Sequence, residues 1–378
     1  MAEHLSQSEL DYPFKLLEYF NGFRISKVIF SACELGVFDV LLQSQKPMSS
    51  GEVAQKLTAN EGGIERLLDV LVAIEIVEVE QLHGTAYYSS TDVANLYLAK
   101  SSPKSLHNLI MYYSQTIYPL WNNLVDAVRE GKNQNERTFG LPSEEIFSAI
   151  YRSEEEMLKF MGLMNSTWVI DGHDIVTAFD LSCFKSIIDL GGEYECSLYL
   201  GTLTTRDSCP ILRHVNLRLF AGCSGALARE LAKEYPSSTV TVLDLPNVVQ
   251  TAQRHFVQQD DTVQFQEGDF FEGEIPTADL FILARIIHDW KEEKNLKLLK
   301  KVHTACHPGG GILIVEAMLF ENRRGPTMAQ IFSLNMLVQT EGKEHPPSHY
   351  TRLLTEAGFR DAQVCRTGKS YDAILALK

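Results

Sequence analysis

The sequence predicts an α/β protein in which a doubly wound, mostly parallel sheet follows a smaller helical module. From residue 186 onward, short β-branched and apolar runs alternate with helical runs, an order typical of a parallel sheet. Residues 15–110 instead show helical periodicity interrupted by one hairpin pattern. The chain has 378 residues, which exceeds one typical domain. We therefore expect two domains, 1–112 and 113–378.

Composition excludes several classes of protein. Apolar residues make up 45% of the chain and charged residues 22%, as in ordinary soluble domains. The net charge of -15 argues against a nucleic-acid partner, which would require an excess of Lys and Arg. The seven cysteines include no C-x-x-C pair, so neither a zinc site nor a disulfide framework is indicated. Because the sequence shows no signal peptide and no apolar run of about 18 residues, we expect a reduced, cytoplasmic protein without a membrane partner.

The N-terminal part has the order of a winged helix. Ser49 and Glu52 form a capping-box pattern at the start of a short helix, and Asn60 precedes a second one. An alternating stretch around His83-Gly84 then predicts a hairpin. A winged helix can bind DNA, but the second helix here is rich in acidic residues. We therefore interpret this module as a dimerisation domain.

Two long helical runs, 119–132 and 144–169, connect this module to the sheet. The later chain then alternates between strand-like and helix-like runs. The last two strand-like runs have no helix between them, which predicts an antiparallel hairpin at the edge of the sheet. The predicted strands are 186–192, 239–245, 263–271, 278–285, 311–319, 361–367 and 371–378, and the predicted helices are 228–236, 246–256, 291–306 and 350–358.

Ligands of open α/β sheets bind beyond the carboxyl ends of the strands. The first predicted strand ends in Asp-Leu-Gly191-Gly, the second in Asp244 and the third in Gly268-Asp269-Phe270. Acidic side chains at neighbouring strand ends suit ribose hydroxyls and an adenine amine but would repel a pyrophosphate. The G-x-G-x-x-G pattern for a pyrophosphate is also missing from the sequence. These residues predict a nucleoside ligand that carries no phosphate.

The fourth predicted strand leads directly into the strongest catalytic candidate, His288. Glu316 closes the next strand and Glu344 lies in a later loop, so either carboxylate could orient the imidazole. A histidine held by an acid can take a proton from a weakly acidic hydroxyl group. A phenol has a pKa of about 10 and is mostly un-ionised at neutral pH, so such a base would help to activate it.

These motifs together resemble one family, the small-molecule S-adenosylmethionine-dependent O-methyltransferases. The resemblance covers almost the whole chain and is closest to the acetylserotonin O-methyltransferases of animals. It implies a Rossmann-like methyltransferase sheet, a homodimer formed through the N-terminal helices, and transfer of a methyl group to a phenolic oxygen without a metal. The stretches that carry it are IIDLGG…SGALA, VLDLP, EGDFF, ARIIHDW, PGGGILIVE and LNMLVQTEGKE…HY.

The resemblance also implies roles for individual residues. His288 would be the general base beside Glu316 and Glu344. S-adenosylmethionine would contact the glycine loop and several strand ends and helices, whereas the substrate's amide and indole would contact two further residues. The implied substrate is N-acetylserotonin, and the product is melatonin. The implied cofactor contacts are Tyr151, Trp168, Gly191, Asp244, Gly268, Asp269, Phe270 and Arg285, and the implied substrate contacts are Asp289 and Asn335.

The resemblance is interrupted at residues 193–222, which separate the glycine turn from the helix that should follow it. Without this segment the chain would read DLGG-CSGALARE, as the family pattern requires. Closing such a loop costs only on the order of a few kcal/mol, so the fold can tolerate it. The segment could nevertheless obstruct the cofactor. Two alternatives to the acetylserotonin reaction therefore stay open: a dimerising homologue impaired in catalysis, and an O-methyltransferase for another small phenol.

Overall fold

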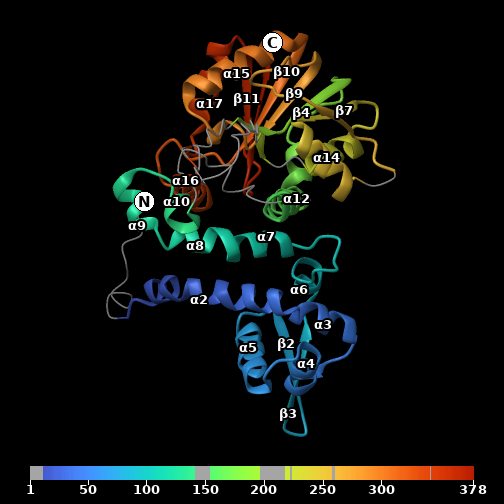
Figure 1. Ribbon diagram of the computed structural model, residues 1–378, viewed down its shortest axis with the longest axis vertical. Coiled ribbons are helices and arrows are strands. Elements are labelled where there is room, and N and C mark those ends of the chain that lie inside the picture. Colours follow the sequence, from blue (N-terminus) through green and yellow to red (C-terminus); the bar gives the residue numbers. More distant parts are fainter. Residues whose placement is uncertain (1–11, 141–153, 196–217, 222–223, 258–259, 341) are drawn as a thin grey trace, which may run out of the picture. The chain divides into compact units, whose positions relative to one another are not determined.

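The computed structural model describes residues 12–140, 154–195, 218–221, 224–257, 260–340 and 342–378 (Figure 1). The chain divides into two compact units, Met1–Gln115 and Thr116–Lys378. Each unit has its own apolar core. The predicted site residues all belong to the second unit, which is therefore described in more detail.

The first unit contains a three-stranded sheet of order β1-β3-β2, packed with helices. The capping box predicted at Ser49 and Glu52 is present, and Asn60 caps the next helix as expected. The hairpin turns at His83 and Gly84, both at positive φ. The elements are α2 (Phe14–Leu35), α3 (Val37–Ser44), β1 (Met48–Ser49), α4 (Ser50–Leu57), α5 (Glu61–Ala73), β2 (Val77–Leu82), β3 (Thr85–Ser90), α6 (Asp92–Tyr97) and α7 (His107–Tyr112), and the boundary between the units falls within the π-helix η1 (Tyr113–Ile117).

The second unit is built on a seven-stranded sheet of order β11-β12-β10-β9-β4-β7-β8. The five neighbouring strands β10, β9, β4, β7 and β8 run parallel to one another. Toward the other edge, β12 pairs antiparallel with β10 on one side and with β11 on the other. The predictions of a doubly wound sheet and of a C-terminal edge hairpin are therefore confirmed. The strands are β4 (Ser186–Leu190), β7 (Thr239–Asp244), β8 (Gln264–Glu267), β9 (Ala278–Ala284), β10 (Cys306–Glu316), β11 (Arg360–Cys365) and β12 (Asp372–Leu377).

Successive apolar residues of each central strand point to opposite faces of the sheet, as the two-residue period requires. In β4, for example, Ile187 packs into one core and Ile188 into the other. One face is covered by α12 (Glu154–Val176), α13 (Ala226–Glu234) and α14 (Pro246–His255), and the other by α15 (Glu292–Ala305) and α17 (Pro347–Ala357) (Figure 1). A sheet buried on both faces leaves the carboxyl ends of its strands as the natural ligand site.

The connecting helices differ from the sequence predictions. The run 119–132 does not form one helix, because α8 (Tyr118–Trp121) ends and α9 (Leu124–Glu130) begins around Asn122 and Asn123. The second predicted helix extends beyond residue 169, to Val176, and residues 144–153 lie outside the described part of the chain. Two further helices, α10 (Asn135–Phe139) and α16 (Thr327–Gln339), were not predicted.

The segment 193–222 begins and ends in a strand pair. β5 (Gly192–Glu195) and β6 (Arg218–Ala221) form an antiparallel ladder in which Gly192 pairs with Ala221. The chain therefore leaves β4 and returns to the same place before α13 begins. The predicted fold around the segment is retained, because β4 still pairs with both β7 and β9.

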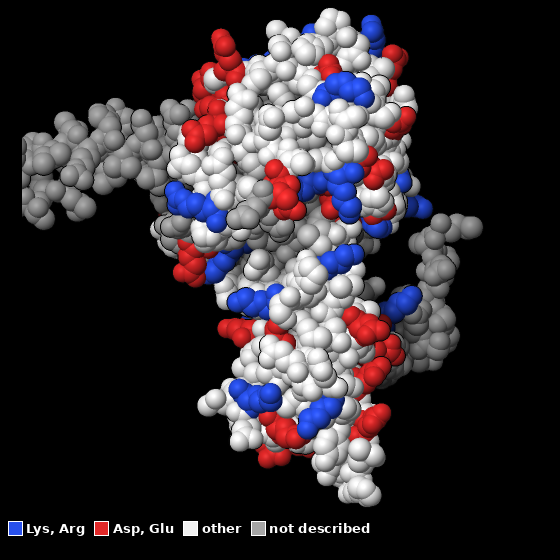
Figure 2. All heavy atoms as spheres, turned by 90° about the vertical axis from the view of Figure 1, so that its right-hand side faces the viewer, with Lys and Arg blue, Asp and Glu red and all other residues white. Residues whose placement is uncertain are grey.

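Charged side chains of both signs are interspersed on the face shown in Figure 2, without a continuous basic stripe among the described residues. Within the described ranges, no helix has the length and apolar character needed to cross a membrane.

Candidate active site

The carboxyl end of β9 turns sharply toward the candidate site. Arg285 follows the strand with a φ of +60°, an unusual backbone conformation for a residue other than glycine. Its amide still donates a hydrogen bond to the carbonyl of Val315 on β10, at 2.8 Å. The chain then forms the short 3-10 helix η2 (Ile287–Asp289), which carries His288. Backbone strain of this kind is common at functional sites.

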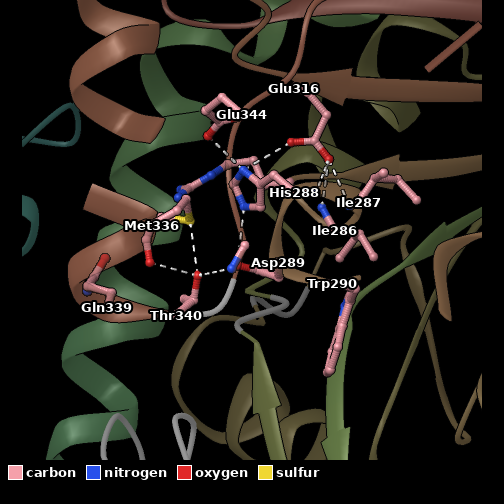
Figure 3. A network of polar contacts seen from close by, with 12 residues as sticks. Ile286, Ile287, His288, Asp289, Trp290, Glu316, Met336, Gln339, Thr340 and Glu344 are labelled. Carbon is pink, nitrogen blue, oxygen red and sulfur yellow. Dashed lines mark hydrogen bonds and ion pairs between the residues drawn. The ribbon is translucent and has the colours of Figure 1, made fainter. Parts of the chain in front are cut away.

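His288 is surrounded by three carboxylates (Figure 3). Its Nδ1 lies 2.8 Å from Glu344 Oε1 and 3.2 Å from Glu316 Oε2. On the other side of the ring, Nε2 lies 3.5 Å from Asp289 Oδ1. His288 is 3% exposed, Glu316 0% and Glu344 2%. Because an ionised carboxylate can only accept, Nδ1 donates to Glu344, and Nε2 carries the lone pair of the neutral ring.

Glu316 holds the turn as well as the imidazole. Its Oε1 accepts hydrogen bonds from the backbone amides of Ile286, Ile287 and His288 at 3.1, 2.8 and 3.3 Å (Figure 3). Asn295 of α15 donates from Nδ2 to the carbonyl of Ile287, at 2.8 Å. These contacts fix the backbone that carries the imidazole. Asn295 was not predicted from the sequence. The only signal for it was a polar residue in the predicted helix seven residues after His288.

The loop after α16 brings Glu344 to the imidazole. The amide of Lys343 donates to the carbonyl of His288, at 2.9 Å. A side chain at Gly342 would place its Cβ 1.8 Å from the same carbonyl oxygen. The loop can therefore approach the turn only with glycine at this position. The role of Gly342 was not predicted either. The available signal was its position two residues before the candidate acid Glu344.

The carboxylates determine the proton affinity of the cluster. Burial alone would lower the pKa of the imidazole, but the charges of Glu344, Glu316 and Asp289 outweigh it and raise this pKa to about 10. Burial raises the pKa of Glu316 to about 8, and it also raises the pKa of Asp289. A strongly basic imidazole is matched to a phenol, whose pKa is also about 10. Proton transfer between two such groups costs little free energy.

The predicted nucleoside-binding residues lie at the ends of three neighbouring strands. The amide of Gly191 donates to the carbonyl of Leu243 at 3.0 Å, and that of Gly268 donates to the carbonyl of Asp244 at 2.9 Å. A Cβ at Gly268 would lie 2.8 Å from Leu243 Cδ1, so the backbone packs closely here. Asp269 Oδ1 accepts from the amides of the two residues after Phe270, at 2.8 and 2.6 Å. Phe270 is 1% exposed.

The remaining candidates lie on helices. Trp168 of α12 is 5% exposed. Asn335 of α16 accepts a hydrogen bond from Trp121 Nε1 at 2.8 Å and donates one from Nδ2 to Gln339 Oε1 at 2.6 Å. Its carboxamide orientation is therefore determined, and one N–H of Nδ2 has capacity for a further acceptor. Tyr151 lies outside the described residues.

The donor set of His288, Glu316 and Glu344 could in principle bind a metal ion, since one ligand atom from each residue lies within 4.8 Å of the others. The same atoms are already joined by the ion pairs described above. The two buried carboxylates, Glu316 and Glu344, need no metal to compensate them, because the imidazolium of His288 neutralises part of their charge.

Comparison with known proteins identifies the family of this chain. Residues 121–196 and 211–360 match a family model described as an O-methyltransferase domain, and residues 17–100 match an O-methyltransferase dimerisation domain. Acetylserotonin O-methyltransferase of Gallus gallus is 50% identical over 374 residues, which cover 99% of both chains. The chain belongs to the acetylserotonin O-methyltransferase family. The family resemblance seen in the motifs is thus confirmed.

Further relatives of this family member agree with the assignment. Acetylserotonin O-methyltransferase of Homo sapiens is 45% identical over 373 residues, covering 98% of this chain and 99% of its own. A crystal structure of the human enzyme in complex with S-adenosylmethionine matches with a TM-score of 0.86 and 44% identity, covering 100% of this chain and 99% of that one. The structure of mitomycin 7-O-methyltransferase, at 20% identity and a TM-score of 0.75, shares the fold.

Proposed function

We propose that this chain transfers a methyl group from S-adenosylmethionine to the phenolic hydroxyl of N-acetylserotonin, giving melatonin, with His288 as the general base. The observation that carries the proposal is the buried imidazole whose Nδ1 is held 2.8 Å from Glu344, which directs the lone pair of Nε2 away from Glu344 and Glu316 and toward the side of Asp289. The relatives that match over nearly the full length support this reaction.

The strand ends fit S-adenosylmethionine. Gly191 and Gly268 allow close approach to the backbone, and Asp244 supplies a carboxylate for ribose hydroxyls. Asp269 and Phe270 would lie beside the adenosine, with Arg285, Trp168 and Tyr151 nearer the methionine end. When bound, the cofactor supplies an electrophilic methyl group. The acidic character of these strand ends suits a ligand without phosphates.

The residues of the chain would activate and orient the phenol. His288 Nε2 accepts the phenolic proton, and the resulting imidazolium is stabilised by Glu344 and Glu316. Asp289 lies on the Nε2 side of the ring and would contact the indole. The available N–H of Asn335 would donate to the acetamide carbonyl of the substrate.

The proposal is tested by incubating the purified chain with S-adenosylmethionine and N-acetylserotonin and measuring melatonin by mass spectrometry. We expect equal amounts of melatonin and S-adenosylhomocysteine, and a kcat/KM at least about tenfold above that for simple phenols, as expected when a positioned amide contact is lost. Equal values for all phenols would contradict the assigned substrate. Absence of any methylated product would contradict the reaction itself.

Deleting residues 193–222 should have little effect on cofactor binding. Because Gly192 pairs with Ala221, the two ends of the segment lie side by side, and the chain can pass from β4 to α13 without it. We expect the Kd for S-adenosylmethionine, measured by titration calorimetry, to change by less than about threefold. The shorter chain should be at least as stable, since a long loop no longer has to be closed. A Kd at least about tenfold lower after the deletion would show that the segment obstructs the site.

Replacing Gly342 with Ala should lower kcat/KM by about tenfold or more, since a Cβ 1.8 Å from the His288 carbonyl forces the loop and Glu344 away from the imidazole. Gly62→Ala is a matched control, because a Cβ there would have its nearest contact at an ordinary 3.6 Å. Steady-state kinetics of both variants measure the effect. Unchanged kinetics in Gly342→Ala would mean that the loop position does not matter for catalysis.

The reaction should also be independent of metal ions. We expect dialysis against a chelator to leave kcat unchanged, because the donor atoms of His288, Glu316 and Glu344 are already joined to one another by ion pairs. A loss of activity that added Mg²⁺ or Zn²⁺ restores would assign the His288, Glu316 and Glu344 donor set to a metal.

The chain is proposed to act as a homodimer. Support comes from the matched dimerisation domain and from the apolar side chains of α2, of which Phe14, Tyr19 and Phe20 are at least 59% exposed. Exposed apolar surface of this extent is typical of an interaction site. Sedimentation equilibrium should give twice the mass of the chain. The cytoplasmic location stays a prediction from the sequence.

A further inference from the structure

Tyr371, immediately before β12, lies between three elements that carry proposed site residues. Its ring centroid is 5.5 Å from that of Trp168 on α12 and 6.0 Å from that of Phe332 on α16. The guanidinium carbon of Arg285, beyond β9, lies 5.4 Å from the same centroid. Tyr371 is 5% exposed. A residue near the end of the chain thus packs between the helices and the strand end that form the site.

Each of the three residues of the turn that carries Tyr371 contacts a different residue of α12. Lys369 forms an ion pair with Asp174, and the hydroxyl of Ser370 donates to the carboxylate of Asp171. Tyr371 then meets the indole of Trp168. The three helix residues, Trp168, Asp171 and Asp174, are spaced three apart and therefore lie along one side of the helix.

The turn is held in place from the sheet side as well. Arg366 Nη1 donates to Asp372 Oδ2 at 2.5 Å and to the carbonyl of Met318 at 2.6 Å. The amide of Thr367 donates to Asp372 Oδ1, at 3.1 Å. Since both ends of the turn are anchored, the position of the Tyr371 ring is determined by the sheet.

Arg285 and α12 are linked directly as well as through Tyr371. Arg285 Nη1 lies 3.0 Å from the sulfur of Met164, one helical turn before Trp168. A tyrosine ring beside both the indole and the guanidinium limits how far either can move. Removing the ring would leave a space into which both side chains could shift.

We propose that Tyr371 is a positioning residue that holds Trp168 and Arg285 in place to bind the methionine end of S-adenosylmethionine. The Lys369–Tyr371 turn connects the edge hairpin to α12 through the contacts described above. This inference rests on the proposed function, in which Trp168 and Arg285 contact the cofactor. Tyr371 itself acts through these two residues.

The test compares three variants of the full chain by titration calorimetry with S-adenosylmethionine. We expect Tyr371→Leu to raise the Kd about tenfold, which corresponds to about 1.4 kcal/mol, while the KM for N-acetylserotonin changes less than about twofold. Tyr371→Phe keeps the ring and should bind as the wild type does. Tyr235→Leu is the matched control, because the hydroxyl of Tyr235 bonds to the carbonyls of Val176 and Phe179 at the far end of α12.

A purely structural role would lower the melting temperature in both leucine variants and leave both Kd values unchanged, which would overturn the inference. If Tyr371→Leu does not fold, the double variant Lys369→Met/Ser370→Ala removes two outer contacts of the turn. It should raise the Kd about fivefold, and an unchanged Kd would overturn the inference. If the wild-type chain fails to bind S-adenosylmethionine, the proposed function fails instead, so the two results are distinguishable.

Discussion

Replacing His288 with Gln is expected to lower kcat/KM for N-acetylserotonin by about 10³-fold, within the range that a general base contributes. Glutamine can fill the space between Glu344 and Glu316, but it cannot accept the phenolic proton at neutral pH. The Kd for S-adenosylmethionine should change less than about threefold, because the residues proposed to bind the nucleoside, such as Asp244 and Gly268, belong to other strand ends.

Steady-state kinetics and titration calorimetry together separate these effects. His255→Gln is the matched control, since His255 is exposed at the end of α14. It should leave both quantities unchanged. If His288→Gln retained more than about a tenth of the wild-type kcat/KM, proton removal by His288 would not be an important part of catalysis.

Replacing Glu344 with Gln is expected to lower kcat/KM at its plateau by about 10²-fold and to move the pH profile. The active form of His288 is the neutral imidazole, and its pKa is raised to about 10 by the carboxylates around it. In the wild type, kcat/KM should therefore keep rising as the pH increases above neutrality. The variant lacks one of these negative charges, so the pKa falls and the rise should occur at lower pH.

The plateau falls because the carboxamide introduced by Glu344→Gln can present an N–H to Nδ1, which would place the imidazole proton on Nε2 and block it as an acceptor. A profile of kcat/KM against pH for the wild type and for Glu344→Gln measures both changes. Glu316→Gln is a useful comparison, because Glu316 also accepts three backbone amides and its replacement should lower the melting temperature more. A rise at the same pH in the wild type and in Glu344→Gln would mean that Glu344 does not set the basicity of His288.

Much of the fold could be predicted because it is encoded in local patterns. Alternation of strand and helix signals specified a doubly wound sheet, and the missing helix between the last two strands indicated their antiparallel pairing. The helix boundaries were less predictable. Asn122 and Asn123 interrupt a run whose helical periodicity is continuous, so the sequence showed no sign of the break between α8 and α9. The helix α16 has apolar residues on most sides and therefore lacked a clear amphipathic signal.

The candidate site was predictable only in part. His288 could be selected because it follows a buried strand at the end where ligands bind. The choice between Glu316 and Glu344 as its partner could not be made, because the sequence alone does not give the distance of either carboxylate from the imidazole. The structure shows two different contacts: Glu344 approaches Nδ1 at 2.8 Å, and Glu316 also holds the backbone of the turn.

Residue types at short, regular spacing were enough to establish the class of fold, and they also predicted the strand ends expected to face a ligand and the proposed base. Which side chains meet at those strand ends depends instead on tertiary packing. Glu344 is 56 residues from His288, and Tyr371 reaches Trp168 from the far edge of the sheet. Contacts across such separations depend on how helices and strands pack, and on a Cβ being absent at Gly342, rather than on any local pattern.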